Sequence, residues 1–398
     1  MRILLYTETA LPRVGGQELV VDALARSFVA AGHTVQVLAP WSRFSHGLDP
    51  AAMPYEVAWH PRFVSTRHFV SQYANWLSLA QRRGQFDVVH CHSTYPNGYV
   101  ASCCQALSAL PMLVTSHGQD VGPGSLAERK PRLVPRYGAA LRRADGWIAI
   151  GRFTEEKYLE LARRSAEGRS DPLANPFLVN AKIRRLPNGV FCEECTRPAA
   201  RPKEVPAALR PHGYLLFLGR LVERKGVDIL LRALALLHAK HRLPLAIAGE
   251  GPARAELQSL ASALGIASGV HFVGRVAGEA KRWLLQHSLF TVLPSRGWEA
   301  FPLVVLESCA AGRPVLATRI PCLDDAVQPG QNGWLVEPEL PAALASELRG
   351  LLSNREGVEQ MACRARAWCA PFDWRHIAER HLELYEELLA RRWRSAAA

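Results

Sequence analysis

Short apolar segments of strand character alternate with helical segments along almost the whole chain of 398 residues. Strands separated by helices form parallel sheets that are covered by helices on both faces, so the pattern predicts an α/β fold. In the first half we expect strands at 2–7, 34–39, 87–92, 112–116 and 146–150, and a helix over about 18–31. In the second half we expect strands at 214–218, 245–248, 271–273, 290–293, 314–317 and 333–336, and helices near 226–238 and 374–394.

Two stretches interrupt this alternation. Residues 163–182 are polar and irregular and are predicted to form a surface loop, whereas residues 196–212 are rich in Pro, Arg and Ala and suit a linker. The chain is therefore expected to form two Rossmann-like, doubly wound domains at 1–195 and 213–372, and a C-terminal helix at 373–398 that packs back toward the first domain. Ligands of such sheets bind beyond the carboxyl ends of the strands, so functional residues are expected in loops that follow strands and line a cleft.

The net charge of +12, from 48 basic and 36 acidic residues, favours anionic partners. No nucleic-acid-binding module is visible, so nucleic acid is not an expected partner. One basic cluster is interpreted as a solvated helix face, with contact to an anionic membrane as the alternative; its members are Arg129, Lys130, Arg132, Arg136, Arg142 and Arg143. There is no apolar run long enough to span a bilayer, and the N-terminus reads as a first strand. We therefore expect a cytoplasmic protein, with peripheral contact to the inner face of the membrane left open.

Neither a disulfide framework nor a metal centre is expected. The nine cysteines are scattered, and the one CxxC motif, Cys192 and Cys195, has no second pair at matching spacing. Asp324 and Asp325 are adjacent, but no neighbouring ligands accompany them, so they are interpreted as structural. The sequence therefore predicts no required metal.

The loops of the second predicted domain contain paired cations and paired carboxylates. Arg220 and Lys225 follow its first strand, and both side chains suit a diphosphate. Glu299 and Glu307 are separated by seven residues, and Pro302 between them suits the first turn of a helix. Two carboxylates beside a helix N-terminus can hold sugar and ribose hydroxyls while the N-terminus holds phosphates. Two incidental glutamates on a helix remain the alternative.

The first predicted domain has two weaker signals. Gly15 and Gly16 follow its first strand and suit a plain turn or a phosphate loop equally well. Because they do not form a GxGxxG motif, a nicotinamide or flavin site is disfavoured. His117 follows a later strand, near Asp120, and a lone loop histidine is more often without a role than catalytic.

These motifs together resemble the family-4 retaining glycosyltransferases, which have the GT-B fold. The resemblance covers nearly the whole chain and includes Leu186-Pro-Asn-Gly-Val190 and Phe372-Asp-Trp374. It implies that Arg220 and Lys225 bind the donor diphosphate, and that Glu307 binds the ribose and Glu299 the sugar. The other implied donor contacts come from His117, the amides near Gly15 and Gly16, backbone at Arg275 and Val276, and Phe301 and Leu303.

The resemblance implies transfer of a hexose-like sugar from a UDP- or GDP-sugar, with retained configuration and no further cofactor. The acceptor would be a glycan, a lipid-linked molecule or a small molecule, in polysaccharide or glycolipid synthesis, and would bind to the first domain. A GT-B phosphorylase, a sugar-nucleotide epimerase or a catalytically silent sugar-nucleotide-binding protein are the alternatives. Ala300 and Pro302 stand where many family members have glycine, which leaves the donor's identity more open than the activity.

Overall fold

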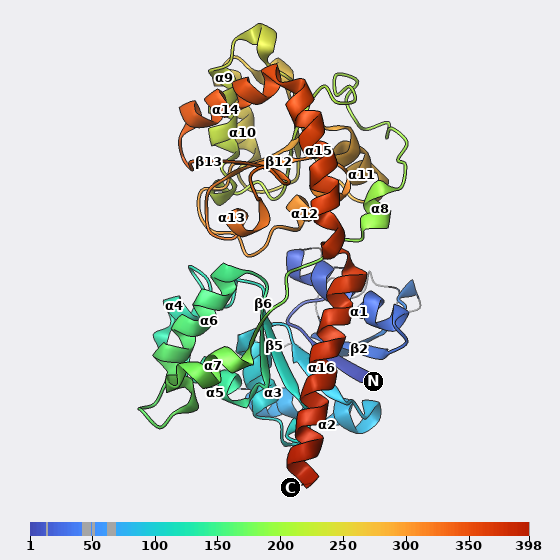
Figure 1. Cartoon of the computed structure of the whole chain (residues 1–398), viewed down its shortest axis with the longest axis vertical. Helices are drawn as coiled ribbons and strands as arrows, with labels where there is room; N and C mark the ends of the chain where they lie inside the picture. Colours follow the sequence, from blue (N-terminus) through green and yellow to red (C-terminus); the bar gives the residue numbers. More distant parts are fainter. Residues whose placement is uncertain (13–14, 42–48, 50–51, 62–68, 398) are drawn as a thin grey trace. The chain divides into compact units, whose positions relative to one another are not determined.

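The computed structural model describes residues 1–12, 15–41, 49, 52–61 and 69–397. It divides into two compact units (Figure 1). The first unit contains Met1–Asn188 and the chain from Trp374 onward, and the second contains Gly189–Asp373. Each unit is built on one parallel sheet, which confirms the predicted α/β class with two doubly wound domains.

The first unit has a seven-stranded sheet in the order β3-β2-β1-β4-β5-β6-β7. All neighbouring strands are parallel, and the order reverses between β1 and β4. The strands are β1 (Arg2–Tyr6), β2 (Thr34–Pro40), β3 (Glu56–His60), β4 (Val88–Cys91), β5 (Met112–Ser116), β6 (Gly146–Ala149) and β7 (Ile183–Arg185).

The helices of the first unit pack against this sheet (Figure 1). They are α1 (Gly16–Ala30), α2 (Val70–Gly84), α3 (Tyr99–Ser102), α4 (Leu126–Arg129), α5 (Val134–Arg143), α6 (Arg152–Ser165), α7 (Pro176–Lys182) and α16 (Trp374–Ala397). The main apolar core lies on the sheet face of Leu4, Val89 and Val114.

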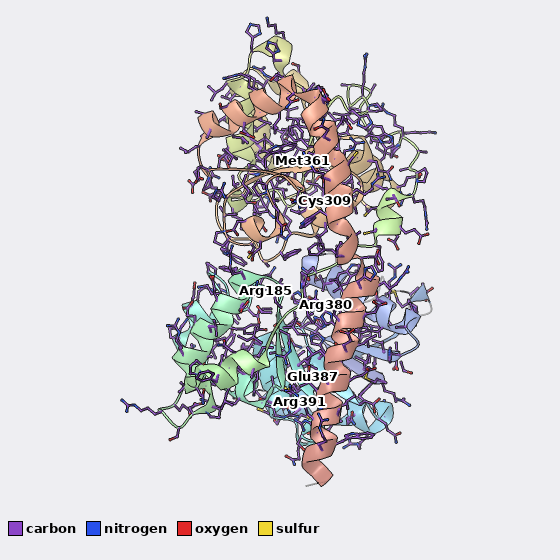
Figure 2. The ribbon with its side chains drawn as sticks, in the orientation of Figure 1. Arg185, Cys309, Met361, Arg380, Glu387 and Arg391 are labelled. Atoms are coloured by element: carbon purple, nitrogen blue, oxygen red, sulfur yellow. The ribbon has the colours of Figure 1, made fainter. Side chains whose placement is uncertain are left out.

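The last helix, α16, packs on α1 of the first unit. The ring of Tyr385 meets that of Phe28 edge to face, with centroids 5.7 Å apart. Figure 2 marks Arg380 and Glu387 along α16, where Arg380 donates to the carbonyl of Arg185 at 3.1 Å. The helix is therefore held by apolar packing on α1 and by polar contacts to β7.

The second unit has a six-stranded parallel sheet in the order β10-β9-β8-β11-β12-β13, which reverses between β8 and β11. The strands are β8 (Leu215–Leu218), β9 (Leu245–Ala248), β10 (Val270–Gly274), β11 (Thr291–Leu293), β12 (Val315–Thr318) and β13 (Gly333–Val336). The helices are α8 (Cys192–Thr196), α9 (Val227–Ala235), α10 (Arg254–Ala263), α11 (Gly278–His287), α12 (Leu303–Ala310), α13 (Leu323–Ala326), α14 (Pro341–Ser353) and α15 (Arg355–Cys369).

Alternate residues of β8, β9 and β10 enter two separate apolar clusters. Leu215 and Phe217 of β8 belong to a cluster with α9 and α14, whereas Leu216 lies on the other face with Trp283 of α11. Helix α12 is covered in turn by α15, and Figure 2 marks the buried residues Cys309 and Met361 on these two helices. The near-continuous burial of the strands is that of a parallel sheet covered on both faces.

Strands β3 and β7 were not expected, because Glu56, His60, Arg184 and Arg185 leave no clear apolar run there. Two further segments differ from the expectation. The stretch predicted as an irregular loop at 163–182 ends in helix α7, because Pro176 suits a first turn and the Asn175 side chain accepts from the amides of Phe177 and Leu178. The stretch predicted as a linker at 196–212 packs within the second unit, where Leu209 is fully buried. Proline-rich composition signals an irregular backbone, and it does not reveal that the segment's few apolar side chains are buried.

None of the helices among the described residues is both long and apolar enough to span a bilayer. The nine cysteines are all described, and none forms a disulfide.

Gly226, which precedes α9, determines how closely the loop after β8 approaches the loop after β11. Its φ is +64°, and a Cβ there would lie 1.9 Å from the carbonyl oxygen of Pro294. We expect Gly226→Ala to lower the free energy of unfolding by at least about 3 kcal/mol, since backbone strain and a backbone clash combine. The matched control is Gly265→Ala, at φ +67° with nothing within 4 Å, which should cost about 1 kcal/mol. Equal losses in urea unfolding would show that the contact with Pro294 does not matter.

Candidate functional site

The strand reversal of the second sheet brings its site loops together. β8 and β11 are neighbours, the loop after β8 carries Lys225, and the loop after β11 carries Glu299. The Lys225 Nζ lies 2.6 Å from Glu299 Oε1. These two residues, 74 positions apart in sequence, are therefore direct partners at the carboxyl edge of the sheet, where such folds bind ligands.

Glu299 is a buried carboxylate with only 5% of its surface exposed. Ser295 Oγ donates to it at 2.8 Å, and Arg224 Nη1 lies 3.4 Å from its other oxygen. Burial alone would raise the pKa of Glu299, but Lys225, Arg224 and the hydrogen bonds from Lys225 and Ser295 outweigh it and hold the pKa below its ordinary value. Glu299 is thus an anion that can accept hydrogen bonds from hydroxyl groups.

Further polar contacts join the loops after β8 and β11. Arg296 donates from Nη1 and Nη2 to the two carboxylate oxygens of Asp228, at 2.9 and 2.6 Å. Its backbone amide donates to the Arg224 carbonyl at 2.9 Å. Bidentate arginine–carboxylate pairs fix orientation as well as distance. The positions of Lys225 and Glu299 are therefore held from both sides.

Arg220, the other predicted diphosphate cation, lies at the start of the same loop. Its side chain is exposed and has no hydrogen bond or ion pair within the described part of the chain. An exposed guanidinium without a protein partner, beside a loop that already holds Lys225, is available to an anionic ligand.

Glu307 lies in α12, which begins at Leu303 after Pro302. Its Oε1 is 2.6 Å from Nζ of Lys281, a residue of α11. The two glutamates of the motif therefore form separate ion pairs, Glu299 before the helix and Glu307 within it. Lys281 was not predicted from the sequence, because a lysine on a polar helix carries no signal of its partner.

The remaining predicted donor contacts in the second unit lie around these pairs. Phe301 is buried, and its ring stacks on Phe372 with centroids 6.4 Å apart, so it supports the start of α12. Leu303 is the first residue of that helix and is half-buried. Arg275 is exposed directly after β10, and Val276 packs against the cluster that contains Trp283.

In the first unit, Gly15 caps α1 and Gly16 begins it. A Cβ at Gly16 would have no heavy atom within 4 Å, so the backbone there is open to approach. Gln17 donates to Thr7 Oγ1 at 3.0 Å and to the carbonyl of His92 at 2.9 Å, which ties the helix start to the ends of β1 and β4. Arg13 and Val14 of the same predicted loop lie outside the described residues.

His117 follows β5 and keeps 9% of its surface exposed. Its Nε2 lies 3.0 Å from Nδ1 of His92, the residue that follows β4. Burial lowers the pKa of His117 to about 4, so the imidazole is neutral near pH 7. His117 was a candidate from the sequence and His92 was not, although His90 and His92 alternate along and just after β4.

Asp120, the carboxylate near His117 in the sequence, is bound by groups of the neighbouring loops. It accepts from Ser116 Oγ at 2.6 Å and from the Thr94 amide at 2.7 Å. Burial raises its pKa. Asp120 therefore braces the loops after β4 and β5.

Part of the basic cluster is bound internally. Arg142 pairs with Asp171 at 2.5 Å, and Arg143 donates to the carbonyls of Leu107 and Leu110. Arg129, Lys130 and Arg132 remain exposed. Among the described residues no three His, Cys, Asp or Glu side chains are grouped so as to hold a metal ion.

Comparison with known proteins identifies the family. The model described as Glycosyltransferase Family 4 matches residues 14–167, and the model described as Glycosyl transferases group 1 matches residues 204–368. A glycogen synthase of Mycobacterium tuberculosis is 30% identical, and the alignment covers 97% of this chain and 94% of that protein. A D-inositol 3-phosphate glycosyltransferase of Catenulispora acidiphila is also 30% identical, over 77% of this chain and 73% of that protein.

Solved structures agree on the fold. The sucrose-phosphate synthase of Thermosynechococcus elongatus superposes with a TM-score of 0.76 at 21% identity, covering 98% of this chain and 100% of that one. Anabaena HepE in complex with UDP gives a TM-score of 0.76 at 18% identity, covering 97% of this chain and 100% of that one. The protein is therefore a glycosyltransferase with the predicted GT-B fold. The chain belongs to the family-4 glycosyltransferases.

The buried histidines of the first unit predict loss of stability in mild acid. Burial lowers the pKa of His117 and His381 to about 4 and holds those of His90 and His92 well below the ordinary value. The unfolded chain, with histidine pKa values of about 6.5, binds more protons in between, so the free energy of unfolding falls as pH drops from about 6.5 toward 4. Each titrating histidine contributes about 1.4 kcal/mol per pH unit.

Urea unfolding across this pH range measures the effect, and two histidines on α16 provide a matched pair. His381→Gln removes a buried histidine and should flatten the dependence, whereas His376→Gln changes an exposed one and should leave it unaltered. A wild-type stability that does not change between about pH 7 and pH 5 would contradict the prediction.

Proposed function

We propose that this glycosyltransferase uses a nucleoside-diphosphate sugar, of the UDP or GDP type, and transfers the sugar with retained configuration and without a required metal. The observation that carries the proposal is the cation group at the β8 and β11 loops. Arg220 has no protein partner among the described residues, and Lys225 lies beside the start of α12. The UDP complex of the structurally similar HepE is consistent with a diphosphate at such a site.

In this proposal the diphosphate is met by Arg220, by Lys225 and by the free amides at the start of α12. Charge that develops on the departing diphosphate is stabilised by groups already in place, which is usually a large catalytic contribution. Lys225 has three N–H donors and uses one on Glu299, so others remain for phosphate oxygens.

Glu299 would accept hydrogen bonds from the donor sugar, and Glu307 from the ribose hydroxyls. The lowered pKa of Glu299 suits an acceptor and not a proton donor. Lys281 holds the Glu307 carboxylate in one orientation, at 2.6 Å, before a ribose binds. His117 would bind a hydroxyl group of the donor sugar.

The acceptor is proposed only by class, as a glycan, a lipid-linked molecule or a small molecule. The relatives carry the names glycogen synthase and D-inositol 3-phosphate glycosyltransferase, which point to different products. The exposed Arg129, Lys130 and Arg132 are compatible with a lipid-linked acceptor at an anionic surface. Flotation with anionic and neutral vesicles tests this part, and equal partitioning would count against it.

Arg220→Ala gives the sharpest test of the diphosphate site. Because its side chain has no protein partner in the described structure, the change should leave the melting temperature unaltered and lower kcat about 100-fold. Lys225→Ala should lower kcat similarly but also reduce stability, since it strips a cation from buried Glu299. Lys240→Ala, an exposed lysine of the same unit, is the control and should behave as wild type. Wild-type rates in both site variants would refute the assignment.

Donor identity and stereochemistry need a separate assay. A thermal-shift screen of UDP-, GDP-, ADP- and CMP-sugars should give one stabilising donor class, and Glu307→Ala should weaken its binding about tenfold. NMR of the product then reports the anomeric configuration, and activity should survive EDTA. Release of sugar phosphate that depends on inorganic phosphate would indicate a phosphorylase. Binding without transfer or hydrolysis over a broad acceptor panel would indicate a silent binding protein.

A further inference from the structure

A row of buried histidines runs from α16 to His117 in the first unit. His90 and His92 alternate along and just after β4, so their side chains share the sheet face opposite the main apolar core. Both are fully buried, and their rings lie 4.3 Å apart between centroids. A buried polar atom needs a hydrogen-bond partner, so the contacts of each ring nitrogen show what the row can do.

In the half of the row nearest α16, both ring nitrogens of His90 have hydrogen-bond partners. His90 Nδ1 lies 2.6 Å from the Tyr385 hydroxyl, and its Nε2 lies 2.6 Å from Thr115 Oγ1. On α16, His381 donates from Nδ1 to the carbonyl of Ile377 at 2.8 Å. These contacts account for both nitrogens of His90 and anchor that ring between helix and sheet.

The half that contains His92 and His117 is not symmetric. His92 Nδ1 meets His117 Nε2 at 3.0 Å, with the two ring planes within 15° of each other. The other nitrogen of His92, Nε2, is buried and has no hydrogen-bond partner among the described residues. Nδ1 of His117 has no hydrogen-bond partner in the described part of the chain either, and it belongs to the one ring of the pair that keeps some exposed surface.

Proton counting distinguishes two arrangements. Burial favours the neutral form of both rings, so one proton lies in the contact between them. If His117 donated, His92 would carry its proton on Nε2, as a buried N–H without an acceptor. If His92 donates, its Nε2 is an unprotonated nitrogen, and His117 carries its proton on Nδ1. Orphaned buried N–H groups are rarer in proteins than unsatisfied acceptors, which favours the second arrangement.

We infer that His92 is a positioning residue, which donates from Nδ1 to His117 and thereby makes the Nδ1 of His117 a hydrogen-bond donor toward ligand. The backbone supports this geometry, because the carbonyl of His92 accepts from Gln17 at 2.9 Å at the start of α1. The inference rests on the proposed function in one respect, that His117 faces the donor sugar. The ligand group it would bind is an acceptor, such as a hydroxyl oxygen, and His117 does not act as a base.

NMR of the protein with isotope-labelled histidine tests the tautomer without any assay of activity. The His117 signals, assigned by their loss in His117→Asn, should show a protonated Nδ1 and an accepting Nε2 in the wild type. A His117 protonated on Nε2 in the wild type would overturn the inference, whether or not any His92 variant folds.

Substitution of His92 gives the matched series. His92→Asn keeps an N–H donor close to the position of Nδ1 and should keep the tautomer of His117 and at least half of the wild-type kcat. His92→Leu removes the donor, and we expect a mixture of tautomers and about a tenfold loss of kcat/KM. Tyr385→Phe is the control, since it breaks the hydrogen bond to His90 and leaves the contact between His92 and His117. It should lower the melting temperature and leave both tautomer and turnover unchanged.

The outcomes separate this inference from the proposed function. An unchanged His117 tautomer in folded His92→Leu would refute the role of His92. If the tautomer responds as expected but His117→Ala keeps wild-type donor turnover, the positioning by His92 stands, and the proposed contact of His117 with the sugar is wrong.

Discussion

The buried carboxylate of Glu299 is the constraint on which the site of the second unit depends. A carboxylate with 5% exposure must be compensated, and Lys225, Arg224 and Ser295 do so from two different loops. That compensation is possible only because β8 and β11 are neighbours at the reversal of the sheet and because Gly226 lets one loop approach the backbone of the other. The strand order, Gly226 and the ion pair between Lys225 and Glu299 together place cations beside the start of α12.

In the first unit, neutral groups hold the loops that follow the strands. Its sheet also reverses between adjacent strands, β1 and β4, and Gln17 joins the loops that follow them. His92 then contacts His117 in the loop after β5. Desolvated imidazoles stay uncharged, so their hydrogen bonds orient each other without the cost of a buried charge. The second unit therefore orients its loops with charged groups, and the first unit orients its loops with neutral ones.

Most strands were predictable because each is a short apolar run flanked by turn residues, and the start of α12 followed from Pro302. Strands β3 and β7 were not expected, because charged and polar side chains interrupt their apolar character. Partners were harder to predict. Lys281 and Arg224 look like ordinary solvated cations, since nothing local shows that folding brings them to Glu307 and Glu299. The burial of Leu209 in a proline-rich stretch, like the contact between His92 and His117, depends on tertiary packing and leaves no periodic trace in the sequence. Sequence patterns thus predict most strands and the loops that carry candidate residues. The partners of those residues are determined by tertiary packing.

Pro302 illustrates how a departure from the family pattern acts locally. Proline lacks an N–H, so a contact that a glycine amide would make at this position is absent. The amide of Val305 already bonds to the Pro302 carbonyl at 3.0 Å, but the amides of Leu303 and Val304 are at the first turn, where helices have no internal partners. Two donors therefore remain for phosphate oxygens at the start of α12. The loss falls on the side toward Ala300 and Glu299, the side that would hold the sugar, so the change bears on which sugar is accepted more than on whether a diphosphate binds.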